Sequence, residues 1–285
     1  MSARAAVKFG FGCTVFACAA WGSPDVLRRA EALYQHTDYA GSLRLLAADP
    51  VPDPDNYLLA GKDYFMMGDY KKAVESFEKF VALSPRSSEG ELWLGRAWGR
   101  RAETGSWVTA VSHATHARQA FEKAVALDPR NNEAKNDLFD YYLNAPAMLG
   151  GGIDKAEAEA RGIAAERPAE YEFDEAQLAE KRKDFKSAED HLRRAIELDP
   201  QSPGRVVDLA RFLAKRGRFA ESDELFEKAR AMAPGRAKTL FAQASSDLEN
   251  HRNREQARQL LQEYLKADLT PDDPSRQEAG KLLRH

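Results

Sequence analysis

Residues 54–87 read PDNYLLAGKDYFMMGDYKKAVESFEKFVALSPRS, and this stretch decides the fold. Its first half places a glycine, Gly61, among larger apolar residues, which indicates a helix that a neighbouring helix approaches closely. Its second half places Ala73 and Phe77 four residues apart, so their side chains share one face of a second helix. The turn at 68–70 contains a glycine, which suits the left-handed residue that ends a helix. The stretch therefore predicts a helical hairpin.

The same pattern recurs along the chain, aligned on a proline that closes each unit. In every unit, small or apolar residues stand five, eight and twelve positions before that proline. The closing prolines are Pro85, Pro129, Pro168, Pro200 and Pro234. Proline lacks an N–H and costs about 3 kcal/mol inside a helix, so each is predicted to end the second helix of its pair. Such repeats predict an all-α solenoid whose core lies between neighbouring units.

On these residues the chain resembles the tetratricopeptide repeat (TPR) family. The unit 54–87 carries the family pattern in Leu59, Gly61, Tyr64, Gly68, Tyr70, Ala73, Phe77 and Pro85. Units 169–202 and 203–236 match it and are contiguous, whereas 24–50 and 237–270 are degenerate, as terminal repeats are. The resemblance implies a right-handed superhelix of about six to seven helix-turn-helix repeats.

The repeat register also predicts the domain organisation. We expect the solenoid to span 23–273 and a capping helix to occupy 274–285. Two stretches exceed the family spacing, near 99–112 and near 144–152, and the first of these is predicted to lengthen a hairpin so that it projects beyond the others.

The N-terminal segment has the pattern of a secretory signal peptide, predicted to span 1–22. Arg4 and Lys8 precede an apolar run that ends in small residues. The run is about twelve residues, too short as a helix for the ~30 Å hydrocarbon core of a membrane. Two processing routes remain open: cleavage after Ala20 or Gly22, or a lipobox-like cleavage that puts a lipid on Cys18. Either route predicts export to the periplasm or envelope of a bacterium.

Composition excludes several function classes. The 285 residues are 43% apolar and 31% charged, and 42 Lys and Arg against 45 Asp and Glu leave a formal net charge of −3. This balance gives no support for nucleic-acid binding through phosphate neutralisation. The only two cysteines, Cys13 and Cys18, lie in the leader, so the body is expected to have no disulfide.

No motif predicts catalysis, a metal or a cofactor. There is no Gly-x-Ser-x-Gly elbow, no cysteine in the body and no dinucleotide fingerprint. His113 and His116 share a helical face but lack a third ligand, and a solvated helix explains them as well. The glycines at 150–152 before Lys155 suggest an anion-binding turn; the alternative is a permissive turn with Asp154 as N-cap. We therefore expect no enzyme and no cofactor.

The remaining candidate site is the concave surface of the solenoid, where TPR proteins bind extended peptides or partner helices. The resemblance transfers the family's groove positions to this sequence. These candidate contacts are Leu58, Leu59, Lys62, Phe65, Leu92, Trp93, Arg96, Asn136, Asp137, Asp140, Phe173, Asp174, Gln177 and Arg211. Some of them are alternatively expected to pack between adjacent repeats. Residues 131–180 hold twelve Asp and Glu against four Lys and Arg, so a partner segment with apolar anchors followed by basic residues fits the groove.

Three functions remain open at this point. The first is a non-catalytic exported scaffold that binds a protein or peptide partner. The second is a periplasmic accessory protein of a solute transporter, which a hydrophobic channel near Trp93, Trp98 and Trp107 would support. The third is an envelope-assembly lipoprotein, which contacts the membrane only through a lipid on Cys18.

Overall fold

The structure, a computed structural model, describes residues 24–49 and 53–284, and these contain helices and no strand. The leader, Cys18 included, lies outside the described residues. The first helices of seven successive pairs are α1 (Pro24–Gln35), α3 (Pro54–Met66), α5 (Ser88–Thr104), α7 (Asn132–Asn144), α9 (Pro168–Lys181), α11 (Pro203–Lys215) and α13 (Ala237–Glu249). The second helices are α2 (Tyr39–Ala47), α4 (Tyr70–Leu83), α6 (Trp107–Leu127), α8 (Ile153–Ile163), α10 (Phe185–Leu198), α12 (Phe219–Met232) and α14 (Arg254–Lys266). A 3-10 turn, η1 (Ala147–Leu149), precedes α8, and α15 (Arg276–Leu282) follows the last pair.

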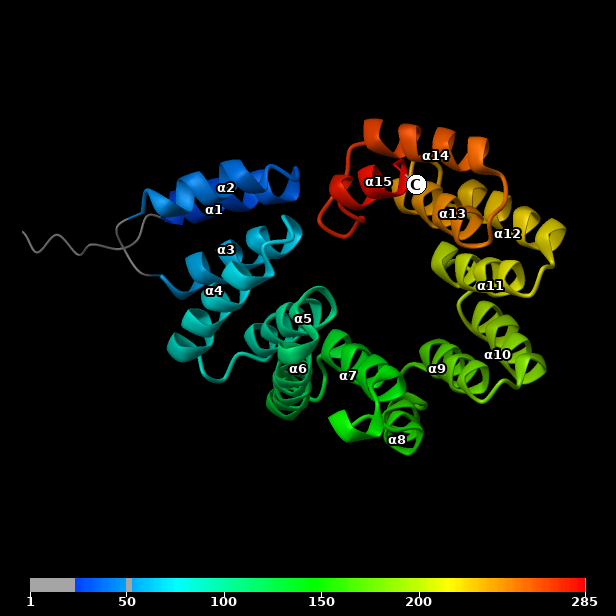
Figure 1. Ribbon diagram of the computed structural model, residues 1–285, viewed down its shortest axis with the longest axis horizontal. Coiled ribbons are helices and arrows are strands. Elements are labelled where there is room, and N and C mark those ends of the chain that lie inside the picture. The colour runs from blue at the N-terminus through cyan, green and yellow to red at the C-terminus, as the bar shows by residue number, and fades with distance from the viewer. Residues whose placement is uncertain (1–23, 50–52, 285) are drawn as a thin grey trace, which may run out of the picture.

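The helix pairs form the all-α solenoid that the repeats predict. Figure 1 shows the pairs arranged around a ring, with α3, α5, α7, α9, α11 and α13 on its inner side and α4, α6, α8, α10, α12 and α14 on its outer side. The two ends of the solenoid come close together, since Thr37 and Tyr39 of the first pair line one cavity with Leu269 and Gln277 of the C-terminal segment. The first helices therefore line the concave inner surface of a nearly closed ring.

Helix ends follow from local chemistry. The side chains of Asp69 and Asp184 accept hydrogen bonds from backbone N–H groups in the first turns of α4 and α10, which satisfies donors that a helix start leaves free. Gly68 and Gly217 take the left-handed conformation (φ +78° and +76°), as the sequence predicts, and Lys183 takes it (φ +64°) at the equivalent turn. A lysine has a steric cost there that glycine avoids.

The closing prolines divide into two groups. Pro85, Pro129, Pro200 and Pro234 each follow a helix end by two residues, as predicted. The prediction for Pro168 is wrong, because α8 already ends at Ile163 and Pro168 is the first residue of α9. Its missing N–H costs nothing there, since the first turn of a helix leaves its N–H groups unpaired within the helix.

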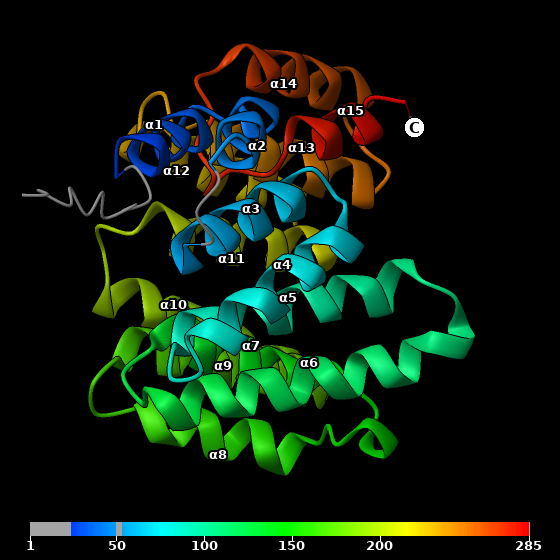
Figure 2. The same ribbon diagram turned by 90° about the vertical axis from the view of Figure 1, so that its left-hand side faces the viewer.

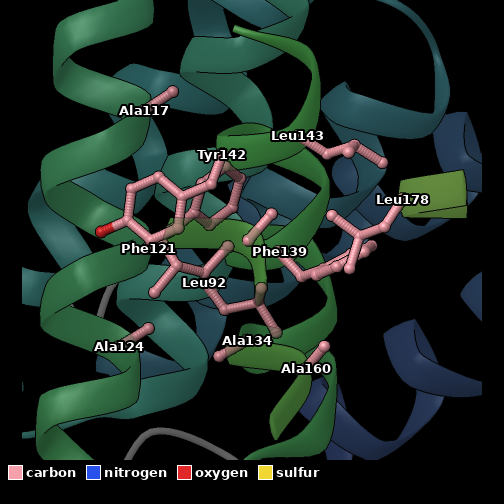
Figure 3. Close-up of a cluster of buried hydrophobic side chains, with 12 residues drawn as sticks. Leu92, Ala117, Phe121, Ala124, Ala134, Phe139, Tyr142, Leu143, Ala160 and Leu178 are labelled. Carbon is pink, nitrogen blue, oxygen red and sulfur yellow. The ribbon is translucent and has the colours of Figure 1, made fainter. Parts of the chain in front are cut away.

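The core lies between successive helices. One buried cluster joins Leu92 of α5, Phe121 of α6, Phe139 of α7 and Leu178 of α9, and Figure 3 shows these side chains meeting. The glycines permit the close helix contact that the sequence predicts: a Cβ at Gly61 would lie 2.4 Å from the Phe77 ring. The same relation holds at Gly95, where a Cβ would lie 2.6 Å from Phe121.

The α5–α6 hairpin is the longest of the solenoid. Helices α5 and α6 have 17 and 21 residues, whereas α3 and α4 have 13 and 14. Figure 2 shows its tip projecting beyond the neighbouring turns. Among the described residues, no helix combines the length and hydropathy that a membrane span requires.

Candidate partner-binding surface

A cavity of about 670 Å³ opens on the concave surface between α3, α5, α6, α7 and η1. Its apolar wall includes Phe65, Trp93, Phe121, Tyr141 and Leu149. Pro271 of the segment between α14 and α15 also lines it, so the cavity receives residues from both ends of the chain. A largely apolar cavity of this size is typical of sites that bury a ligand or an anchoring side chain.

Trp93 is fixed in this wall by contacts on several sides. Its ring lies edge-on to Phe65, with centroids 5.5 Å apart, and stacks on Phe77 at 6.1 Å. Lys62 Nζ and the Arg96 guanidinium lie 5.3 and 4.9 Å from its centroid. These cation–π and aromatic contacts hold the indole in a single orientation, which lowers the entropy cost of using it as a contact.

Carboxylates gather beside the apolar wall. Arg96 Nε donates to Asp137 Oδ2 at 2.5 Å, and Arg96 Nη2 lies 3.0 Å from Glu133 Oε2. Burial raises the pKa of Asp137 above its ordinary value, and Arg96 partly offsets this. The side chain of Asp140 forms no hydrogen bond or ion pair within the described residues, and desolvation together with the nearby Asp137 and Glu170 raises its pKa to about 6.

The acidic surface continues onto the next two repeats. Asp174 on α9 is 3% exposed, and burial, reinforced by Glu170 and Asp140, raises its pKa to about 8. Asp208 stands 34 residues further on, on α11, where burial raises its pKa to about 6. Asp208 is partly exposed, so a cation placed on the concave surface would stabilise its ionised form, whereas Asp174 is too deeply buried to meet one.

Five of the predicted groove residues line the cavity together. They are Phe65, Trp93, Arg96, Asp137 and Asp140. They come from three first helices that are consecutive in space, α3, α5 and α7.

Other predicted groove residues join neighbouring repeats. Lys62 Nζ donates to Glu89 at 2.6 Å, and the Asn136 amide donates to Glu170 Oε1 at 3.1 Å. Arg211 lies 3.7 Å from Glu249 of α13. These side chains therefore have a structural function whether or not a partner binds.

For three residues the prediction of groove contact is wrong. Leu59 and Leu92 are 6% and 2% exposed, because both pack in the cores between helices, and Asp174 is also buried. Leu58 and Phe173 are partly buried at the edges of such cores, and Gln177 is half-buried on the inner helix α9.

Several cavity residues were not predicted. Tyr141 follows Asp140 on α7, Leu149 belongs to η1 and Pro271 precedes α15. The family register covers only positions of the first helices, so it holds no information on an insertion or on the segment after the last repeat. The extra residues near 144–152 were the sequence feature that could have indicated Leu149.

The three tryptophans do not form a channel. Trp93 lies in the cavity wall. Trp98 packs with tilted rings against His113 and His116, with ring centroids 5.1 and 4.8 Å away, and Trp107 is 85% exposed at the hairpin tip. The channel that would have supported solute handling is therefore not formed by these side chains.

The contacts with Trp98 also change the interpretation of His113 and His116. His113 is only 9% exposed, so the prediction that it lies on a solvated face is wrong. Among the described residues, no group of three His, Cys, Asp or Glu is placed to hold a metal ion.

At the glycine-rich turn 150–152, the side chain of Lys155 bonds to the turn itself. Lys155 Nζ donates to the Gly150 carbonyl at 2.8 Å and lies 5.2 Å from the Tyr142 ring centroid. The prediction that Asp154 is the N-cap is wrong, because Gly152 holds that position (φ +155°) and Asp154 lies within the first turn of α8.

Comparisons with known proteins agree with this architecture. Family models described as tetratricopeptide repeat match residues 55–87 and 179–244. The chain contains tetratricopeptide repeats over both stretches. Proteins built from TPRs generally act as scaffolds for protein–protein interaction. No curated protein matches the chain in sequence.

Two solved structures share the TPR fold over most of their length. A TPR protein from Parabacteroides merdae is 14% identical, with a TM-score of 0.57, covering 91% of this chain and 96% of its own. A thermophilic TPR protein from Thermus thermophilus is 21% identical, with a TM-score of 0.51, covering 70% of this chain and 97% of its own. At these identities the likeness describes the fold alone.

Proposed function

We propose that this TPR protein is a non-catalytic scaffold that binds an extended segment of a partner protein on its concave surface. The observation that carries the proposal is the cavity of about 670 Å³, whose apolar wall adjoins the unpaired carboxylate of Asp140. An apolar anchor of the partner would enter beside Phe65 and Trp93, and a following Lys or Arg would meet Asp140.

The electrostatics support a basic partner. The Asp140 side chain has no ion pair within the described residues, and its pKa of about 6 reflects a carboxylate whose charge is poorly compensated. A bound cation would supply that compensation and would lower the pKa. Proton release on binding below about pH 6.5 is therefore expected, and it is measurable by calorimetry in buffers of different ionisation enthalpy.

The proposal is tested by selection from a random dodecapeptide display library on the intact chain. We expect enriched peptides to carry an aromatic or aliphatic residue followed by Lys or Arg. Their binding should be weakened by about 30-fold with Trp93→Ala and by less with Asp140→Asn. Trp107→Ala is the matched control, since Trp107 lies outside the cavity. Enrichment that is independent of Trp93 would refute this site.

A second candidate, handling of a small solute, is supported only by the volume of the cavity, which lies in the range of small-molecule sites. Native mass spectrometry of the protein purified from its source separates the two. A copurified small molecule that Trp93→Ala removes, together with no peptide enrichment, favours solute handling.

We also propose that the chain is exported, on the basis of Arg4, Lys8 and the apolar run up to Ala20. N-terminal sequencing of the mature protein tests this. A start near Ser23 supports simple cleavage, and a blocked Cys18 with a mobility shift abolished by Cys18→Ala supports the lipoprotein alternative. An intact Met1 in the mature protein contradicts export through this segment.

A further inference from the structure

Exposed apolar side chains gather on one edge of the solenoid, which the concave cavity does not use. This turn edge is where the first helix of each pair turns into the second, on the right in Figure 2. The α5–α6 tip projects farthest, since α5 exceeds α3 by four residues, or about 6 Å of helix. At this tip Trp107 is 85% exposed and Val108 is 66% exposed.

Neighbouring turns extend this apolar edge. Met148 of η1, which packs against α6, is 84% exposed. Phe185 and Phe219 begin α10 and α12 at the next turns, and each is 38% exposed. Single exposed apolar residues are common on protein surfaces, but exposed large side chains at four turns of one edge form a row.

Cations accompany the apolar side chains. The exposed Arg216 guanidinium lies 3.9 Å from the Phe185 ring centroid, whereas Arg252, 4.7 Å from the Phe219 ring centroid, is largely buried and paired with Asp223 and Asp247. Lys183 and Lys215 are exposed at these turns and form no ion pair within the described residues. In the projecting hairpin, Arg100 and Arg118 are paired with Glu103 and Glu122, whereas Arg101 forms no ion pair within the described residues. Arg101, Lys183, Lys215 and Arg216 are therefore cations of the turn edge that have no carboxylate partner among the described residues.

We propose that the turn edge docks on an anionic lipid bilayer, with Trp107 and Val108 entering the headgroup interface. Tryptophan is favoured at that interface because its ring is apolar and its N–H is polar. Exposed Lys and Arg are attracted to the negative surface of anionic lipids. A convex tip inserts readily into a soft interface, whereas a folded protein would need a matching pocket. The row of turns also presents its cations across several repeats, which fits an extended negative surface.

A site-specific fluorescent probe tests the proposal in the full-length chain. Because the only cysteines are Cys13 and Cys18, changing both to Ser lets Val108→Cys be labelled alone with an environment-sensitive dye. The labelled protein is then mixed with vesicles of phosphatidylcholine alone or with phosphatidylglycerol. We expect a blue shift with the phosphatidylglycerol vesicles, reduced at high salt because salt screens exposed charges.

The matched control is a label at Leu83→Cys, a 53% exposed residue at the end of α4 on the opposite edge. This label should not shift. Adding Lys183→Glu and Lys215→Glu to the Val108→Cys chain should weaken the shift at position 108. The absence of a shift at 108, or equal shifts at 108 and 83, overturns the proposal, because binding through residues 1–22 alone gives that result. A shift at 108 caused by a soluble envelope protein and not by vesicles also overturns it and assigns the tip to a protein partner.

Discussion

Replacing Asp174 by Asn should make the protein more stable at alkaline pH and should leave its stability at acidic pH nearly unchanged. Asp174 is 3% exposed, and its side chain forms no hydrogen bond or ion pair within the described residues. Burial, with Glu170 and Asp140 nearby, raises its pKa to about 8, although Arg167 and Arg205 act in the opposite direction. An unfolded chain releases this proton near its ordinary pKa of about 4.

The sign and size follow from proton linkage. Between about pH 4 and pH 8 the folded chain retains a proton that the unfolded chain has lost, so the free energy of unfolding falls as the pH rises. The pKa of Asp174 differs between the unfolded and folded chain by about four units, and each unit corresponds to ~1.4 kcal/mol. The free energy of unfolding therefore falls by a total on the order of 5 kcal/mol, and the fall is complete above about pH 8. Asn cannot ionise, so the variant avoids this loss.

Urea unfolding followed by circular dichroism at pH 4.5, 6.5 and 8.5 measures the effect. We expect Asp174→Asn to exceed the parent at pH 8.5 by several kcal/mol and to match it at about pH 4.5. Asp190→Asn, on the exposed face of α10, is the control and should leave the pH dependence unchanged. An Asp174→Asn variant with the parent's pH dependence, or one less stable at pH 8.5, would refute the reasoning.

Further predictions concern the core and the concave surface. Phe77→Ala removes a fully buried ring and should lower the free energy of unfolding by about 3 to 5 kcal/mol, measured by urea unfolding; a loss below ~1 kcal/mol would contradict its position in the core. Gly61→Val should lower the melting temperature in thermal unfolding, because a Cβ there would lie 2.4 Å from Phe77, whereas an unchanged melting temperature would mean that the helices separate easily. Arg96→Met leaves the half-buried Asp137 carboxylate without its ion-pair partner and should lower the free energy of unfolding, measured by urea unfolding, by about 1 to 3 kcal/mol. Adding Asp137→Asn should recover part of this loss; if the losses of the two single variants simply add, the two side chains do not interact.

The helices and their pairing were predictable because each unit carries its own signals. Gly61 and Phe77 stand at positions that bring two helices together, and Gly68 ends the first helix, so the hairpin is encoded within 34 residues. The wrong helix end at Pro168 arises because proline is compatible both with the residues after a helix and with the first turn of the next.

The cavity was only partly predictable. Phe65, Trp93 and Arg96 were found because they occupy repeated positions on first helices, whereas Leu59 and Leu92 were wrongly included because at their positions the side chains pack in the cores between helices. Pro271 comes close only because the ends of the solenoid approach each other, and that curvature accumulates over all the repeats. No local pattern records it.

The most direct test of the concave binding site is the affinity of a library-selected peptide, measured by fluorescence anisotropy. Loss of a central aromatic contact is typically worth ~2 kcal/mol, so Trp93→Ala should weaken binding by about 30-fold while Trp107→Ala leaves it unchanged. Equal affinities for the intact chain and Trp93→Ala would contradict the proposal that this cavity receives the partner.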